Sequence, residues 1–209
     1  MQSVYNISRG EIMTDLKQLL GFPFEDREWL VKMLLGSVIT IIPILNFLSL
    51  GYFVRSINYG WRGRRNLPDW DNWSELFRDG FMVFVISLAY LAIPLVLGSL
   101  IAIIPGIGIV LASIIIFIMG LIIPMAIANY AMRRNIKDAF SLGEIFYLAS
   151  RVFNFYVLGY LAATVGLILG VALLLGIPFV GFIGGVFIFY CGVIFSNFLG
   201  VIYHQATMR

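Results

Sequence analysis

Two long stretches of this sequence lack charged side chains. Residues 80–132 and 152–208 contain no Asp, Glu, Lys or Arg, and each is well over the ~20 residues that one helical membrane crossing needs. The whole chain is 61% hydrophobic and 12% charged, whereas soluble domains average about 45–50% apolar and about 25% charged. We therefore expect an integral membrane protein in which each stretch holds two crossings and a turn.

Alternation of apolar and polar residues is also missing, because runs such as residues 114–118 are apolar at every position. A membrane β-barrel needs strands whose residues alternate, and a helix is the other structure that satisfies its own backbone in lipid. The sequence thus predicts an all-α, polytopic transmembrane fold. We expect a single domain over residues 1–209, since no linker or low-complexity segment divides it.

Cysteine and histidine are scarce, with one of each, Cys191 and His204. A single cysteine excludes an intramolecular disulfide and most thiol-based metal sites. A single histidine near the C-terminus disfavours zinc hydrolysis and a Ser-His-Asp arrangement. We expect no enzyme activity, no catalytic residues, no metal and no cofactor.

A polar segment between the apolar stretches occurs twice. Residues 64–77 read RRNLPDWDNWSELF and residues 133–146 read RRNIKDAFSLGEIF. In the second copy Ser141 and Glu144 match a capping box, in which each side chain bonds the other residue's backbone at a helix start. The recurrence predicts a repeated unit in which a polar connector leads into an apolar hairpin.

Three similar turns interrupt the apolar stretches, at residues 42–47, 104–109 and 177–182. Each has the order Ile, Pro, any residue, aliphatic, then Gly or Asn, where proline stops the incoming helix and Gly or Asn tolerates a positive φ. The helices that return from them end on Asn58-Tyr59, Asn129-Tyr130 and Ile202-Tyr203. The pattern predicts three hairpins, at residues 23–62, 63–134 and 135–209, of which the first is short. The alternative is a single kinked span at residues 33–54, which gives five helices and an external N-terminus.

Basic residues are absent from the three turns and gather at the other ends of the hairpins. The positive-inside rule then predicts that those ends and both termini are cytoplasmic. Residues 1–22 are expected to form an amphipathic helix rather than a signal peptide, because Ser8 and Glu11 match a capping box before apolar residues at helical spacing. This helix lies on the membrane surface or docks on the protein's own polar face.

The most specific motif is Leu-Pro-acidic-Trp at residues 67–70, with Phe-Pro-Phe-Glu-Asp upstream at residues 22–26. By these residues the chain resembles an uncharacterised family of bacterial and archaeal polytopic membrane proteins, a domain of unknown function. The resemblance covers most of the chain. It implies a multi-helix domain in the plasma membrane of a bacterium or archaeon, and it carries over no catalytic residue.

Three sets of residues are candidates for function or assembly. Basic residues at the cytoplasmic interface either bind anionic lipid headgroups or reflect orientation alone: Arg55, Arg62, Arg64, Arg65, Arg133 and Arg134. Small residues, mostly four positions apart, either pack helices within the chain or form a homo-oligomer contact: Gly108, Ala112, Gly166, Gly170, Gly181 and Gly185. A cytoplasmic acidic motif either holds a divalent cation or marks a helix start. Asp71, Glu75 and Asp79 are spaced to stack on one helical face, beside Asp69.

Ionisable groups at membrane depth, which proton- and ion-coupled transporters use, are absent from the apolar stretches. We expect a non-enzymatic membrane protein that acts as an assembly subunit, scaffold or lipid-interacting module, with membrane lipids and either copies of itself or a larger membrane complex as partners. The alternative is a small passive channel or transporter for an uncharged or lipidic solute, with Ser196 and Asn197 as polar lining. An enzyme acting on lipid headgroups, through Asp69, Asp71 and Glu75, is a third hypothesis. No nucleic acid is expected, because the basic residues sit at the bilayer edge.

Overall fold

The structure is a computed structural model that describes residues 18–64, 66–101, 103–104, 106–176 and 181–208. Most of the predicted amphipathic helix at residues 1–22 lies outside them. Every regular element in the described part of the chain is helical, as the composition predicts. In chain order these elements are η1 (Phe22–Glu25), α2 (Trp29–Ile41), α3 (Asn46–Trp61), α4 (Trp73–Ile101), α5 (Gly108–Arg133), η2 (Ile136–Phe140), α6 (Leu142–Arg151), α7 (Phe153–Gly176) and α8 (Gly181–Met208).

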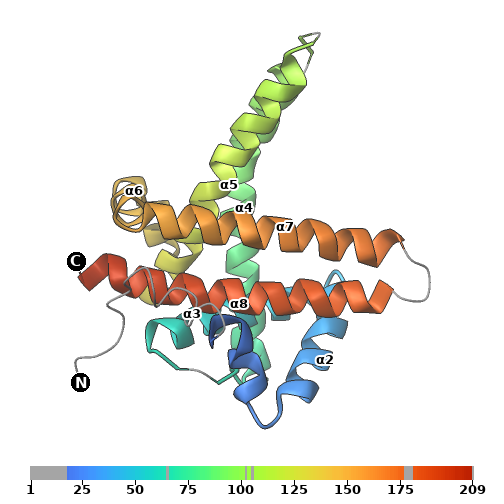
Figure 1. Cartoon of the computed structure of the whole chain (residues 1–209). Helices are drawn as coiled ribbons and strands as arrows, with labels where there is room; N and C mark the ends of the chain where they lie inside the picture. The colour runs from blue at the N-terminus through green and yellow to red at the C-terminus, as the bar shows by residue number, and fades with distance from the viewer. Residues whose placement is uncertain (1–17, 65, 102, 105, 177–180, 209) are drawn as a thin grey trace.

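Three hairpins make up the fold, as the turn pattern predicts: α2 with α3, α4 with α5, and α7 with α8 (Figure 1). The Gly or Asn in the fifth position of the turn pattern was expected to take a positive φ. This expectation is wrong, because that residue begins the next helix. Asn46, Gly108 and Gly181 are instead the first residues of the three return helices. In the second turn the positive φ, 85°, belongs to Gly106. The break at residues 42–45 makes α2 and α3 separate helices rather than one kinked span.

Helix length distinguishes the first hairpin from the other two. Among the described residues, α4, α5, α7 and α8 have 24 to 29 residues and are apolar enough to cross a membrane, and at 1.5 Å per residue they are about 36–44 Å long. α2 has 13 residues and α3 has 16, so they are about 20–24 Å long, below the ~30 Å of a hydrocarbon core. The prediction that the first hairpin is the short one is confirmed.

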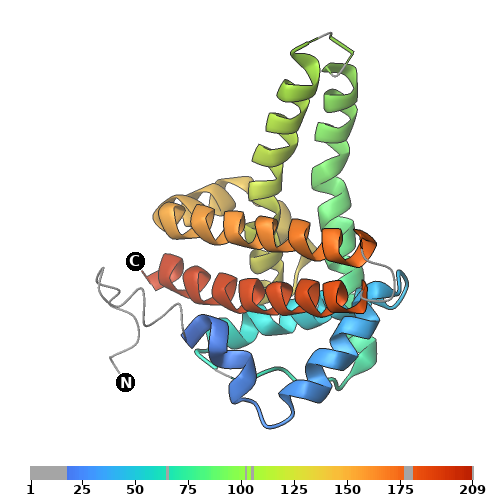
Figure 2. The same cartoon turned by 45° about the vertical axis from the view of Figure 1, so that its right-hand side comes forward.

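The two long hairpins cross rather than lie side by side. In both Figure 1 and Figure 2, α4 and α5 run up the page while α7 and α8 run across it. The far half of the α4–α5 hairpin stands clear of the other helices in both views, and there Ile103, Ile107 and Ile109 are 61–76% exposed. One membrane normal cannot be parallel to both hairpins, so a bilayer that both of them crossed would hold at least one of them at an inclination.

α3 is the helix around which the others pack. It contacts α2, α4, α5 and α8, and its side chains enter both apolar clusters of the core. Val54 and Ile57 belong to the cluster that α3 forms with α4, α5 and α8. Leu48 and Tyr52 belong to the cluster that it forms with α2, the connector before α4, and α8. The short first hairpin thus supplies the centre of the molecule.

Glycines let the backbones of the neighbouring helices come close to α3. A Cβ added at Gly80 of α4 would overlap the carbonyl oxygen of Phe47, and one at Gly200 of α8 would overlap that of Ile57. Close approach of this kind is what holds helices together in lipid, where no hydrophobic force acts between them.

The predicted small residues lie at helix contacts inside the chain. Gly166 and Gly170 on α7 face α8, Gly181 faces the end of α7, Gly185 faces α2, and Ala112 faces α4. Gly108 is buried at the start of α5. Packing within the chain, one of the two predicted roles, therefore accounts for the five whose neighbours are named.

Candidate functional site: an ionic junction and an apolar cavity

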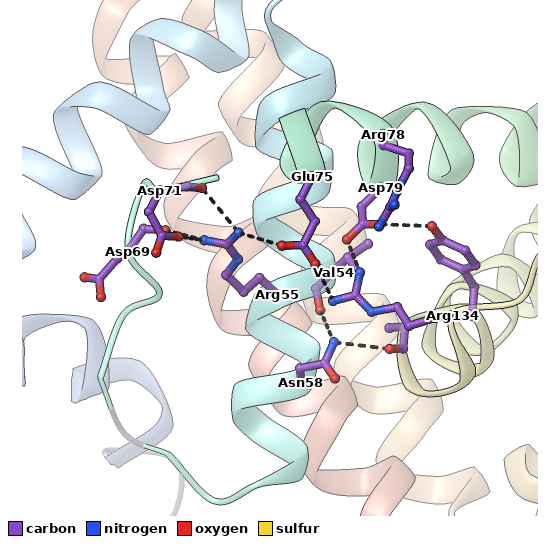
Figure 3. A network of polar contacts seen from close by, with 11 residues as sticks. Val54, Arg55, Asn58, Asp69, Asp71, Glu75, Arg78, Asp79 and Arg134 are labelled. Carbon is purple, nitrogen blue, oxygen red and sulfur yellow. Dashed lines mark hydrogen bonds and ion pairs between the residues drawn. The ribbon is translucent and has the colours of Figure 1, made fainter. Parts of the chain in front are cut away.

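Charged side chains from the first two hairpins meet in one network (Figure 3), which we term the ionic junction. Its members are Arg55 of α3, Asp71 before α4, Glu75, Arg78 and Asp79 of α4, and Arg134 after α5. Glu75 bridges the two sides, with its carboxylate oxygens 3.7 Å from Arg55 Nη2 and 3.6 Å from Arg134 Nη2. Arg55 also binds Asp71, and Arg134 also binds Asp79. Three carboxylates therefore balance three guanidinium groups.

Asp79 is the buried member of the ionic junction, with a side chain only 3% exposed. Besides pairing with Arg134, its carboxylate accepts a hydrogen bond from the Tyr130 hydroxyl at 3.0 Å. These partners matter because a buried charge is costly unless it is paired and hydrogen-bonded. Arg134 reaches Asp79 from a left-handed backbone conformation, φ 57°, which is unfavourable for a residue with a Cβ. The ion pair holds that conformation where the chain leaves α5.

Asp71, Glu75 and Asp79 do not share one helical face, so that expectation is wrong. α4 begins at Trp73, which leaves Asp69 and Asp71 in the connector before it. All four acids face basic side chains: Asp69 lies 2.7 Å from Lys32 Nζ, and the other three belong to the ionic junction. Within the described residues no group of three or more His, Cys, Asp or Glu is arranged to hold a metal ion.

The Leu-Pro-acidic-Trp motif is fastened to α2 and α3 by contacts that we term the motif clasp: Asp26, Lys32, Tyr52, Asp69 and Trp70. Lys32 Nζ lies between the two acids, 2.9 Å from Asp26 and 2.7 Å from Asp69. The buried Tyr52 hydroxyl donates to a backbone carbonyl of the motif at 2.8 Å, and its ring stacks on Trp70 at 4.4 Å. Trp70 Nε1 donates to the carbonyl of Lys32 at 3.1 Å. The most specific motif of the sequence thus anchors the connector to the first hairpin.

The pKa of Asp26 reflects the motif clasp. Burial raises this pKa, but the hydrogen bond from Lys32, the hydrogen bond from the Glu28 N–H and the positive charge of Lys32 together lower it by more. The pKa of Asp26 therefore lies below its ordinary value of 3.8. The carboxylate is ionised at neutral pH and contributes stability there.

Three of the six arginines predicted to contact lipid headgroups pair with carboxylates inside the chain, and these are Arg55, Arg133 and Arg134. Arg62 and Arg64 are exposed, and in the described part of the chain neither forms an ion pair. Arg65 lies outside the described residues. Of the six predicted arginines, Arg62 and Arg64 are therefore the two described ones that form no ion pair with a carboxylate of the described chain.

The predicted capping box at the start of α6 is wrong. Ser141 occupies the N-cap position, but its side chain makes no capping hydrogen bond. Glu144 pairs instead with Arg133, at the end of α5. An acid in the second polar repeat is thus held by an arginine of the preceding helix, as Glu75 of the first repeat is held by Arg55.

Sequence reasoning missed the role of the Asn-Tyr positions that end the return helices. The Asn129 side chain accepts a hydrogen bond from the Tyr203 hydroxyl at 2.6 Å and donates to the carbonyl of Asp138 at 3.1 Å. Asn58 donates to the carbonyl of Ala131 at 3.2 Å. These bonds tie α3 and α8 to α5. The recurrence of Asn-Tyr at equivalent helix ends was the signal that could have revealed them.

An apolar cavity of about 360 Å³ lies where α3, α5, α7 and α8 meet. Ser196, predicted as polar lining, is in its wall, but Asn197 is not. Asn197 is buried, and in the described structure its amide nitrogen has no hydrogen-bond partner. Asn197 therefore does not line this cavity, and a role for Ser196 and Asn197 as the polar lining of a path stays a prediction.

This fold defines the class of the protein as all-helical and polytopic, with four described helices long and apolar enough to cross a membrane. Over residues 34–180 the chain matches the family described as "Protein of unknown function (DUF4013)", and it belongs to that family. The matched region runs from α2 to the third turn and includes the Leu-Pro-acidic-Trp motif. No curated protein and no solved structure matches the chain.

Proposed function

We propose that the protein is a non-enzymatic membrane module that interacts with lipids and serves as a scaffold or assembly subunit. The observation that carries this proposal is the separation of apolar from charged side chains. The long hairpins are apolar, whereas acids and arginines meet at the ends of those hairpins that lie away from the turns, and largely neutralise one another there. Such a molecule offers its environment hydrocarbon surface rather than reactive groups.

The outer face of the third hairpin supports lipid as a partner. On α7, Leu158, Ile168 and Leu175 are 62–78% exposed, and α7 carries apolar residues on all of its faces. Soluble proteins rarely leave contiguous apolar patches larger than a few hundred Å² open to water. Acyl chains, and the apolar faces of further copies or of other membrane subunits, are the partners whose chemistry fits this surface.

The state of the acids supports a role other than catalysis. A general acid or base has to exchange a proton with a substrate that lies within hydrogen-bond reach. Asp71, Glu75 and Asp79 are instead bound to arginines, and Asp69 is bound to Lys32. The acidic motif therefore fits a structural role, in which it fixes the hairpins relative to one another.

The orientation that we propose has the ionic junction and both termini in the cytoplasm of a bacterium or archaeon, with the apolar turns directed into or across the plasma membrane. What supports this orientation is that arginines are numerous at the hairpin ends near the ionic junction and absent from the turns. Arg62 and Arg64 then lie at the cytoplasmic leaflet, where each basic side chain contributes about 1 kcal/mol of attraction to anionic lipid.

The test is to extract the protein together with its surrounding lipid in polymer-bounded discs and to identify that lipid by mass spectrometry. We expect enrichment of anionic phospholipids over the bulk membrane, and we expect replacing Arg62 and Arg64 with Gln to reduce it. Arg78→Gln, which removes the charge of an exposed arginine that already pairs with Asp79, is the matched control. A protein that retains no lipid, or that converts added lipid headgroups, would overturn the proposal.

A passive channel or transporter for an uncharged or lipidic solute is the second candidate, and the apolar cavity favours it. Reconstituted vesicles separate the two candidates. A lipid-interacting module leaves glycerol permeation and the transbilayer movement of a fluorescent phospholipid at the rates of empty vesicles. Rates above those of empty vesicles, abolished by filling the cavity, would establish the second candidate instead.

A further inference from the structure

The apolar cavity is built where the crossed hairpins meet α3. Phe53 of α3, Pro124 of α5, Tyr160 and Leu167 of α7, and Cys191 of α8 are among the residues in its wall. Elements from all three hairpins therefore line one space, which is partly open to the surface. Its volume of about 360 Å³ lies within the roughly 300–1,000 Å³ of small-molecule sites.

The chemistry of the wall selects a hydrocarbon occupant. Among the described residues that line the cavity none is charged, and the hydroxyl of Thr164 already donates to the carbonyl of Tyr160 at 2.8 Å. A space lined in this way offers water too few partners and stays dry. A polar or ionic ligand would lose its hydration there without replacement.

The position of the cavity favours a membrane lipid as the source of that hydrocarbon. Leu167, in the wall, is 50% exposed, so the cavity is accessible from the surface of the molecule at this point. No Asp, Glu, Lys or Arg occurs between Val152 and Met208, so an acyl chain entering past α7 meets none of these charged side chains. In a bilayer the molecules in contact with this face are acyl chains.

We propose that the cavity is a binding site for one acyl chain of a membrane phospholipid, whose headgroup stays outside it. The site rests on the proposed function, since it specifies which part of the lipid the module holds and where. An acyl chain in the cavity supplies packing contacts that the side chains of its wall leave unmade.

The experiment uses the full chain in vesicles that contain a phospholipid with a photoactivatable diazirine near the end of one acyl chain. After illumination, the cross-linked residues are mapped by mass spectrometry. We expect cross-links to concentrate on cavity-lining residues of α7 and α8. Ala163→Phe places a ring in the cavity, and because a filled site must be repacked to admit a ligand we expect at least about a tenfold loss of these cross-links. Ala162→Phe, the same change at the exposed neighbour, should leave them unchanged.

Cys191 gives a second measurement on the unaltered protein, because it is the single cysteine of the chain and lies in the cavity wall. N-phenylmaleimide should alkylate it more slowly in detergent supplemented with long-chain phospholipid than in detergent alone. Equal rates, or cross-links spread evenly over all exposed helix faces and unaffected by Ala163→Phe, would overturn the acyl-chain site while leaving the lipid-interacting module intact. A protein that forms no lipid cross-links and retains no lipid would overturn both.

Discussion

Removing the carboxylate of Asp79 should destabilise the protein more than any other single change in the ionic junction. Asp79 is 3% exposed, pairs with Arg134, and accepts the Tyr130 hydroxyl at 3.0 Å. Breaking a buried ion pair by removing one partner costs about 3–5 kcal/mol, and an unsatisfied buried hydroxyl costs about 1–3 kcal/mol. Arg134 is 39% exposed and keeps Glu75 at 3.6 Å, which places Asp79→Ala near the lower end, at about 3 kcal/mol.

Two further variants separate charge from hydrogen bonding at this position. Asp79→Asn keeps an acceptor for Tyr130 and loses only the charge, so we expect it to cost about 1–2 kcal/mol, since charge-assisted hydrogen bonds are about twice as strong as neutral ones. Asp71→Asn is the matched control, because the Asp71 side chain is 62% exposed and exposed pairs contribute about 0–1 kcal/mol.

The assay is reversible unfolding in mild detergent, followed by the fluorescence of the four tryptophans. Combining Asp79→Asn with Arg134→Gln leaves the net charge as it is in the native chain, and the double-mutant cycle should return a coupling energy of about 0.5–3 kcal/mol. If Asp79→Ala is no more destabilising than Asp71→Asn, or if the cycle is additive, then the junction does not hold the hairpins together and the reasoning fails.

Three other predictions follow from the packing, the motif clasp and the orientation. Gly80→Ala should lower the free energy of unfolding by roughly 2 kcal/mol or more, because its methyl group would overlap a backbone carbonyl of α3. In the control Gly143→Ala, in α6, the methyl group meets open space, and the free energy of unfolding should rise by about 0.5–1 kcal/mol. Similar losses at both sites would contradict the close approach of α4 to α3. The pKa of Asp26 is lower in the folded protein than its ordinary value of 3.8. The stability that the Asp26 carboxylate contributes should therefore be complete above pH 3.8 and lost as the pH falls below that value toward the folded pKa. Asp26→Asn should remove this part of the pH dependence of thermal unfolding. In a Cys191→Ser background, a membrane-impermeant maleimide added outside the cell should label Gly106→Cys but not Lys137→Cys, and labelling of the latter alone would reverse the proposed orientation.

The hairpins could be predicted from the sequence because their signals are local. Pro43 and the glycines of the later turns interrupt long apolar runs at fixed places, and proline ends a helix through its own ring and missing N–H. The absence of charged residues between Gly80 and Met132 predicts a membrane environment for this stretch. Helix number, order and the shortness of the first hairpin follow from such features without knowledge of any tertiary contact.

The crossing of the hairpins could not be predicted, because helices such as α5 and α7 are apolar on every side. In a helix with an apolar stripe, the sequence shows which face is buried, but a uniformly apolar helix has no such stripe. The angle at which it crosses its neighbours is set by the small residues that let the backbones meet, as at Gly80 and Gly200. The partner of each glycine lies on a distant part of the chain, so no spacing within one helix reveals it.

The acids show a different limit. Asp71, Glu75 and Asp79 recur every four residues, which on a helix puts side chains on one face. The helix starts only at Trp73, because the Leu-Pro-acidic-Trp motif before it is held in the motif clasp by Lys32 and Tyr52. Tertiary contacts of the connector, rather than local propensity, therefore decide which acids face α3 and which face α5.

The two polar repeats explain why these charges are inside the molecule. Glu75 and Asp79 follow the first copy of the Arg-Arg-Asn sequence, and Arg134 belongs to the second. The structure brings Arg134 of the second copy onto Glu75 of the first copy and onto Asp79, which follows it. The second connector therefore binds the start of α4 across the hairpin that separates the two copies. Exchanging the charges, with Asp79→Arg and Arg134→Asp together, should therefore restore part of the stability that either change alone removes.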